Sequence, residues 1–180
     1  MKRIVWAITG AGDLLIEITN QIQKLSETGR IEVTTCLSKA GYSVLRWYKL
    51  QDRVEKISKK VHVEQDANTP FIVGPLQTGR YHSLLVAPAT GNTVAKIAHG
   101  IADTLITNAV AQTQKGGVPV YILPVDQKMG EIITYLPSGE QKKLVMREID
   151  IENVKKLKSM KGITVLEAPQ DITRVYLGSE

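Results

Sequence analysis

The sequence predicts an α/β protein with three layers, in which helices cover both faces of a mostly parallel sheet. Short β-branched apolar runs alternate with segments whose apolar residues repeat at helical spacing, as in sheets joined by crossover helices. Near residue 130 the pattern changes to two short strands around a turn, which predicts an appended β-hairpin over about residues 130–149. The length of 180 residues, without internal repeat or linker, predicts a single domain over residues 1–180.

The strands and helices of the first half are predicted from these apolar runs and from the helical spacing of apolar residues. Apolar residues at helical spacing, such as Leu15, Ile18 and Ile22, predict the first helix. Ser38 is the expected N-cap of the second helix, because its hydroxyl can accept a backbone hydrogen bond. The expected elements are strands at 3–9, 31–37 and 61–63, helices at 14–25, 39 to about 50 and 52–60 (separate or a continuation), and a loop at 68–79 that contains two prolines.

The second half repeats the alternation until the hairpin. Thr107 and Asn108 are expected to cap one helix and Asp150 another, while Gly116 and Gly117 break the chain. The expected elements are strands at 83–87, 118–123 and 163–166, helices at 94–102, 107 to about 114 and 150 to about 160, hairpin strands at 131–136 and 142–149, and a tail at 171–177.

Three polar turns fall at the carboxyl ends of predicted parallel strands: residues 10–13, Ser38 and residues 89–93. Ligands of open α/β sheets bind at this edge, so we expect the three turns to converge there. Free N–H groups at a helix N-terminus attract anions, and small side chains let a flat ring approach the backbone. The sequence therefore predicts a binding site for an anionic or polar cofactor.

The first turn argues against a dinucleotide. Residues 9–14, TGAGDL, begin like the GxGxxG fingerprint, but Leu15 stands where the third glycine belongs. The second predicted strand ends in Ser38 and Lys39 rather than in the acidic residue that binds ribose hydroxyls. A hydroxyl, a lysine and a helix N-terminus fit a phosphate better, which favours a mononucleotide such as FMN.

Residues 88–107, PATGNTVAKIAHGIADTLIT, resemble the PASANTxxKIxxGxxDxLLT signature of the superfamily of homo-oligomeric flavin-containing cysteine decarboxylases, with Gly91 in place of the usual alanine. Residues 37–45 are similar to its LSKAA segment, and the hairpin and last helix are most like its archaeal-type branch of archaeoflavoproteins and dihydromethanopterin reductases. The resemblance implies a flavodoxin/Rossmann-like fold and FMN as cofactor. The expected cofactor-binding residues are Thr9, Gly10, Ala11, Gly12, Asp13, Ser38, Ala89, Thr90, Gly91, Asn92 and Thr93.

No catalytic residue is assigned; Asn92 and Asp13 are the candidates. Asn92 would face the flavin ring or the substrate. Asp13 departs from the small residue of many relatives, and a phosphate would repel it, so we expect it to cap the helix or to face ribityl hydroxyls or substrate. For Trp47 and Tyr48 we expect a role in the core or in subunit contact, with stacking over a neighbouring subunit's flavin as the alternative.

The resemblance favours redox use of the flavin. The family's decarboxylases carry a histidine at the position of Gly74, and its prenyltransferases an arginine–glutamate pair at the position of Val125 and Asp126. We therefore expect an FMN-dependent oxidoreductase or electron-transfer flavoprotein, resembling dihydromethanopterin reductase or a ferredoxin-linked archaeoflavoprotein. The alternatives are a non-enzymatic FMN-binding protein and a flavin-dependent decarboxylase of the phosphopantothenoylcysteine type.

Composition limits the partners. The net charge of +5 comes without an aromatic-interleaved basic stripe, so we expect no nucleic acid, and no apolar run is long enough to span a membrane. Cys36 alone can form no internal disulfide or iron–sulfur cluster, and the three histidines lack metal-ligand spacing. We expect a cytoplasmic location and, from the resemblance, a homo-oligomer (trimer or dodecamer), with ferredoxin as a candidate electron donor and a pterin as a candidate substrate.

Overall fold

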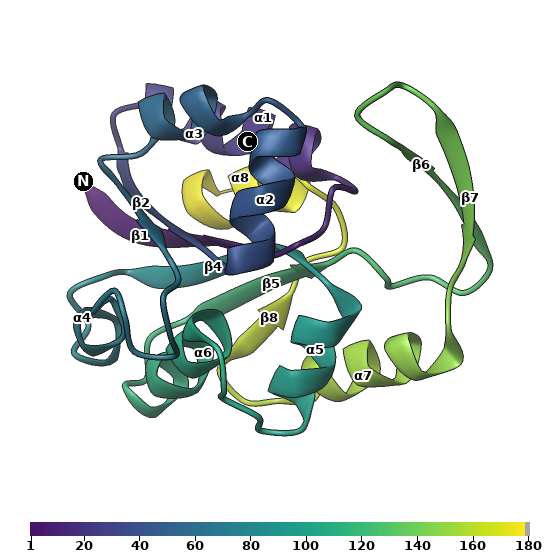
Figure 1. The fold of residues 1–180 in the computed structure, drawn as a ribbon. Helices are drawn as coiled ribbons and strands as arrows, with labels where there is room; N and C mark the ends of the chain where they lie inside the picture. Colours follow the sequence, from purple (N-terminus) through teal and green to yellow (C-terminus); the bar gives the residue numbers. More distant parts are fainter. Residues whose placement is uncertain (179–180) are drawn as a thin grey trace.

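A parallel sheet of six strands forms the centre of the molecule (Figure 1). The computed structural model describes residues 1–178. The strand order is β3-β2-β1-β4-β5-β8, so the direction of strand addition reverses between β1 and β4, where open α/β sheets bind their ligands. The strands are β1 Lys2–Ile8, β2 Ile31–Leu37, β3 Lys60–Val63, β4 Ser83–Ala89, β5 Val120–Pro124 and β8 Ile163–Val165.

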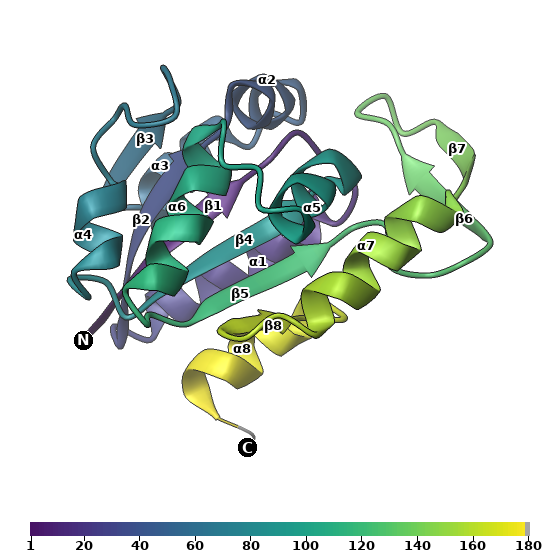
Figure 2. The same ribbon diagram turned by 90° about the horizontal axis from the view of Figure 1, so that it is seen from below.

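Helices cover both faces of this sheet, which confirms the predicted three layers (Figure 2). Helix α1 packs with α3 and α8, whereas α4 packs with α6 and α5 with α7. In β1, Ile4, Trp6 and Ile8 enter one core while Val5 and Ala7 enter the other, so the strand is an unbroken apolar run. The helices are α1 Leu15–Glu27, α2 Lys39–Trp47, α3 Gln51–Ile57, α4 Val73–Gln77, α5 Gly91–Ala98, α6 Leu105–Lys115, α7 Glu148–Lys158 and α8 Gln170–Leu177.

The predicted hairpin is confirmed and stands beside the main sheet rather than in it (Figures 1 and 2). Its antiparallel strands are β6 Glu131–Tyr135 and β7 Gln141–Val145. Ile132 and Leu144 lie on the side that faces the first turn of the sheet edge. A two-stranded hairpin is only marginally stable alone, so its position depends on its contacts with the rest of the domain.

Two helices occur where the sequence predicted none. Helix α4 lies inside the expected loop at 68–79, because Gly74 and Pro75 fall in its first turn, where the missing proline N–H would have no helical partner. Helix α8 replaces the expected tail at 171–177. It buries Ile172 and Tyr176, and the Tyr176 hydroxyl lies 2.8 Å from the Ser83 hydroxyl oxygen.

Several helix boundaries also differ from the prediction. Thr104, not Thr107 or Asn108, caps α6: its hydroxyl accepts from the Thr107 N–H, and the Thr107 hydroxyl accepts in return from the Thr104 N–H. Asp150 does not cap α7 but lies in its first turn, so the helix starts earlier and β7 ends at Val145. Helix α5 begins at Gly91 rather than at residue 94, and α2 and α3 are separate helices.

Cys36 is 1% exposed on β2, as expected for a small buried hydrophobe. Burial raises the pKa of its thiol to about 12, and the nearby Glu64 carboxylate adds to the effect. The thiol is therefore protonated and unreactive in the folded protein. Within residues 1–178, no helix is both long enough and apolar enough to cross a membrane.

Candidate functional site

The first and third predicted turns meet at the switch point between β1 and β4. The Thr9 hydroxyl donates a 2.7 Å hydrogen bond to the Pro88 carbonyl oxygen and accepts one of 3.0 Å from the Thr90 backbone N–H. Thr9 is almost fully buried, so these bonds fix the two strand ends together.

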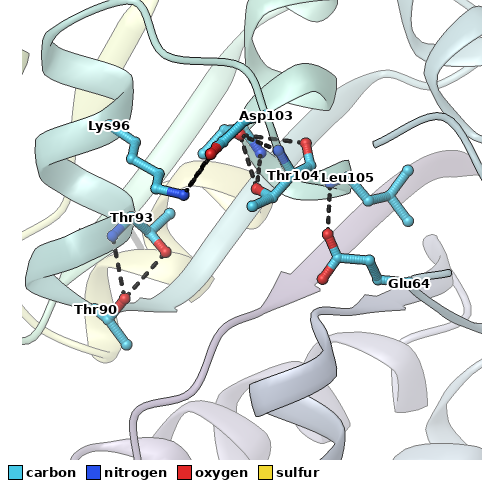
Figure 3. A network of polar contacts seen from close by, with 8 residues as sticks. Glu64, Thr90, Thr93, Lys96, Asp103, Thr104 and Leu105 are labelled. Carbon is cyan, nitrogen blue, oxygen red and sulfur yellow. Dashed lines mark hydrogen bonds and ion pairs between the residues drawn. The ribbon is translucent and has the colours of Figure 1, made fainter. Parts of the chain in front are cut away.

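Hydroxyl side chains cap α2 and α5, two of the helices that start at this edge. The Ser38 Oγ accepts a 2.9 Å hydrogen bond from the Gly41 N–H, which confirms the predicted cap of α2. The Thr90 Oγ1 accepts from the Thr93 N–H at 3.2 Å and donates to the Thr93 hydroxyl at 3.0 Å, which caps α5 (Figure 3). Both helix N-termini therefore point toward the same edge of the sheet.

Glu64 links three elements at this edge, and the sequence analysis missed it. One carboxylate oxygen accepts a 3.1 Å hydrogen bond from the Lys39 N–H at the start of α2. The other accepts a 2.8 Å bond from the Leu105 N–H at the start of α6 (Figure 3). Beside it, Lys96 forms an ion pair of 2.9 Å with Asp103. A glutamate one residue beyond a short strand carries no local signal, because its partners lie 25 and 41 positions away.

A cavity of about 390 Å³, which we call the cap cavity, opens between these helix starts. Six of the predicted cofactor-binding residues line it, together with Lys39, Glu64 and Lys96. The six are Thr9, Gly10, Ser38, Thr90, Asn92 and Thr93.

A second cavity of about 340 Å³, the hairpin cleft, lies between the first turn and the hairpin. It shares Gly10 and Thr90 with the cap cavity, so the two form one trough along the sheet edge. Its lining adds the predicted residues Ala11, Gly12 and Asp13. Among the remaining predicted residues, Ala89 is buried in β4 and Gly91 begins α5, and both lie outside the lining of the two cavities.

The first turn leaves backbone donors free for a ligand. Within residues 1–178, the N–H groups of Gly10, Ala11 and Gly12 donate no hydrogen bond to the protein. Buried or half-buried backbone donors are almost always paired, so three consecutive free donors in a concave turn indicate a site for acceptor atoms. Gly10 is required by packing, since a Cβ there would lie 2.7 Å from the Ala40 Cβ.

Carboxylates surround the other end of the trough. Asp126 lies beside Gly91 at the start of α5, and Asp150 forms a two-bond ion pair with Arg147 at 2.7 Å. Burial and the neighbouring Asp150 raise the pKa of Asp126. A Cβ at position 91 would lie 2.8 Å from an Asp150 oxygen and 2.9 Å from an Asp126 oxygen, which explains the glycine in place of the family's alanine.

For two residues of this region the structure excludes one of the expected roles. Asp13 does not cap α1, because Leu14 occupies the N-cap position and no side chain caps the helix; that it faces ribityl hydroxyls or substrate stays a prediction. Trp47 is not a core residue, since it is 61% exposed and, with Tyr48, lines the hairpin cleft; its role in subunit contact stays a prediction. Both residues lie where α1 and α2 meet the hairpin, a contact that no local pattern encodes.

An open parallel sheet with a polar trough at its switch point defines an α/β protein of the nucleotide-cofactor-binding type. The chain matches the Flavoprotein family over residues 1–176 and belongs to it, which confirms the resemblance. An uncharacterized protein of Methanocaldococcus jannaschii is 51% identical over 98% of this chain and 95% of its own length. A dihydromethanopterin reductase (acceptor) of Methanosarcina mazei is 32% identical over 97% of this chain and 99% of its own length.

A solved structure of a relative has the same fold. Burkholderia xenovorans DmrB in complex with FMN, described as a cubic protein cage for redox transfer, matches with a TM-score of 0.80 at 32% identity, over 97% of this chain and 92% of that one.

Proposed function

We propose that this protein is an FMN-dependent oxidoreductase of the dihydromethanopterin reductase type, with residues 1–180 as one FMN-binding domain. The observation that carries the proposal is the trough of the cap cavity and the hairpin cleft, which is lined by the first turn, whose N–H groups are unpaired within residues 1–178. The family membership and the FMN complex of DmrB support it.

The residues of the trough fit FMN. The cap cavity offers the Ser38 hydroxyl and the ammonium group of Lys39 to the phosphate end, with Lys96 beside them paired with Asp103. The hairpin cleft is less polar, because the small residues Ala11 and Gly12 lie beside apolar hairpin side chains. Small residues let a flat ring system approach the backbone. FMN, when bound, supplies the redox chemistry, and the protein supplies position, shielding from water and electrostatics.

The charges in the trough favour a redox protein over a prenyltransferase or a phosphopantothenoylcysteine decarboxylase. Asp13 and Asp126 line the hairpin cleft, and both have a raised pKa, first of all because of burial. A prenyl diphosphate or a phosphopantothenoyl group would bring further negative charge against them. A neutral ring substrate, or an electron donor that docks outside, meets no such repulsion.

Assembly and partners belong to the same proposal. We expect a homo-oligomer, a trimer or a dodecamer, with ferredoxin as electron donor and a reduced pterin as substrate. The exposed apolar residues Ile133, Tyr135 and Val145 on the outer side of the hairpin are suited to contact between copies. The free, buried Cys36 suits a reducing compartment such as the cytoplasm.

The test is to purify the protein, load it with FMN and add reduced ferredoxin or NAD(P)H without oxygen. We expect a flavin absorption spectrum that bleaches with one donor and recovers when a dihydropterin is added. A flavin that stays oxidised with every donor would indicate a binding or storage protein, and a protein that takes up no FMN would overturn the cofactor assignment.

A pair of variants assigns the site. Asn92 is exposed and lines the cap cavity, and it makes no side-chain hydrogen bond within residues 1–178, so Asn92→Ala should spare the fold. We expect it to weaken FMN binding about twofold to tenfold, the effect of one neutral hydrogen bond. The exposed amide of Gln170 on α8 is the matched control, and Gln170→Ala should leave FMN affinity unchanged.

A further inference from the structure

A third cavity, larger than the cap cavity and the hairpin cleft, continues the trough beyond the hairpin cleft. It has a volume of about 620 Å³ and lies between the start of α1, the end of α2 and the hairpin turn. We call it the aromatic cavity. It shares Gly12, Asp13, Trp47 and Tyr48 with the hairpin cleft, so a ligand in it would lie next to whatever occupies the cleft.

Two aromatic side chains form one wall. The rings of Trp47 and Tyr48 meet edge to face, with centroids 6.2 Å apart and planes 73° apart. Tyr48 lies directly over Gly12, where a Cβ would overlap its ring, and its hydroxyl bonds the Tyr135 carbonyl oxygen. Tyr48 is thus fixed, while Trp47 keeps 61% of its surface exposed beside an open cavity. An aromatic pair held this way offers a stacking surface to a flat ring.

The cavity also has an acidic edge. Asp13 and Glu17 both line it, and within the cavity lining only Lys49 opposes them in charge. Ionised carboxylates accept hydrogen bonds and donate none. This edge therefore complements a ligand with neighbouring N–H and amino donors, and it repels phosphates and carboxylates.

Backbone strain is concentrated at the same place. Within the described residues, Leu14 and Lys49 are the two non-glycine residues with positive φ, at 60° and 55°, and both line the aromatic cavity. Such conformations cost on the order of 1 kcal/mol each and persist where the surrounding structure enforces them, often at functional sites. Leu14 directly follows Asp13, and Lys49 directly follows the two aromatic residues.

The geometry points to the aromatic cavity as the binding site for a reduced pterin ring, with Trp47 and Tyr48 against its face and Asp13 at its edge of amino and N–H donors. A pterin ring is flat, which suits the aromatic pair. It is also uncharged and carries adjacent hydrogen-bond donors on one side, which suits the acidic edge. The inference rests on the proposed function, because the ring would exchange electrons with FMN in the adjoining cleft.

The test is calorimetric titration of the FMN-loaded protein with 7,8-dihydrobiopterin, a dihydropterin without charged groups. We expect Trp47→Leu to weaken its binding about threefold to tenfold, the value of one stacking contact, and Trp47→Phe to restore most of the affinity. Asp13→Asn should weaken it about tenfold or more, since it replaces a charged acceptor. Phe71→Leu, at an aromatic residue 76% exposed just before α4, is the matched control and should change nothing.

Three outcomes would overturn the inference: wild-type protein that binds FMN but no dihydrobiopterin, variants at Trp47 that keep full dihydrobiopterin affinity, and Trp47→Leu protein that loses FMN affinity to the same extent. A change in assembly size without a change in dihydrobiopterin affinity would assign Trp47 to contact between copies and would also overturn it. If wild-type protein takes up no FMN, the proposed function fails, and titration of the FMN-free protein still tests the cavity by the same variants.

Discussion

The Tyr48 hydroxyl donates a 2.9 Å hydrogen bond to the carbonyl oxygen of Tyr135, which joins the end of α2 to β6 across 87 positions of sequence. This bond holds an otherwise separate hairpin against the first turn of the sheet edge. The hairpin in turn walls two of the three connected cavities. The position of the hairpin therefore determines how enclosed the proposed flavin and pterin sites are.

Removing this bond should loosen the hairpin without unfolding the domain. We expect Tyr48→Phe to speed backbone amide exchange in β6 and β7 about twofold to fivefold, because a partly exposed neutral hydrogen bond contributes roughly 0.5–1 kcal/mol. Hydrogen exchange read by mass spectrometry measures this. Tyr42→Phe is the control, since the Tyr42 hydroxyl on the same helix makes no hydrogen bond within residues 1–178. Equal exchange in the Tyr48→Phe and wild-type hairpins would contradict the role of this bond.

Glu64 should matter to stability more than its partly exposed position suggests. Its carboxylate accepts from the Lys39 and Leu105 N–H groups, at the positive ends of α2 and α6. We expect Glu64→Ala to lower the free energy of unfolding by roughly 2 kcal/mol and the melting temperature by roughly 4–8 °C, with Glu64→Gln in between. Glu167→Ala removes an exposed ion pair with Lys158 and should cost less than about 1 kcal/mol. Equal effects of the two alanine substitutions, seen in thermal melts, would refute the capping role.

Gly91 should resist substitution by alanine, the residue at this position of the signature that residues 88–107 resemble. The added Cβ would approach the Asp126 and Asp150 oxygens to 2.9 and 2.8 Å, so we expect Gly91→Ala to cost about 1–3 kcal/mol in urea unfolding. Combining it with Asp126→Ala should recover part of the loss, because one of the two obstructing carboxylates is then gone. A Gly91→Ala protein as stable as wild type would show that the two carboxylates move aside freely.

The sheet and the first helices could be predicted because their signals are local. The alternation of apolar runs in β1, β2 and β4 and the hydroxyl of Ser38 lie within the elements that they define. Helix α8 could not be predicted in this way, since it is held by contacts with α1 and by Tyr176 reaching Ser83, 93 positions away. The start of α6 was misplaced because Thr104 and Thr107 are both hydroxyl residues, and the reciprocal bonds of the capping box decide between them.

Some residues of the candidate site could also be predicted from the sequence, whereas others could not. Turn residues such as Gly10, Ser38 and Thr90 could be found from their places at strand ends, and the structure brings them to one cavity. Glu64 and the placement of Trp47 beside the hairpin could not, because each depends on chain segments far apart in sequence. Residues at strand ends are predictable from topology, whereas residues that close a site from outside the sheet are not.

Asp13 should reduce the stability of the folded protein at neutral pH. Burial raises its pKa above the ordinary value of 3.8, and the carboxylates of Glu17 and Asp126 add to this, against the lowering effect of hydrogen bonds from the Leu14 N–H and the Thr134 side chain. A carboxyl group with a raised pKa binds more protons in the folded than in the unfolded chain, so its contribution to the free energy of unfolding falls as the pH rises from 3.8 through the folded pKa. Asp13→Asn should therefore stabilise the protein at neutral pH, and the gain should vanish below the ordinary pKa.

Urea unfolding of the wild-type and Asp13→Asn proteins across this pH range measures the difference in the free energy of unfolding. Asp103→Asn is the control, for which we expect the opposite change in stability. The hydrogen bond and charge of Lys96 lower the pKa of Asp103, so Asp103→Asn should lower stability at neutral pH and lose its effect in acid. If Asp13→Asn is neutral or destabilising at neutral pH, the hydrogen bonds from Leu14 and Thr134 outweigh burial, and Asp13 is a structural residue. If it stabilises the fold while dihydrobiopterin binding weakens, the carboxylate is kept at a cost in stability for the ligand that it binds.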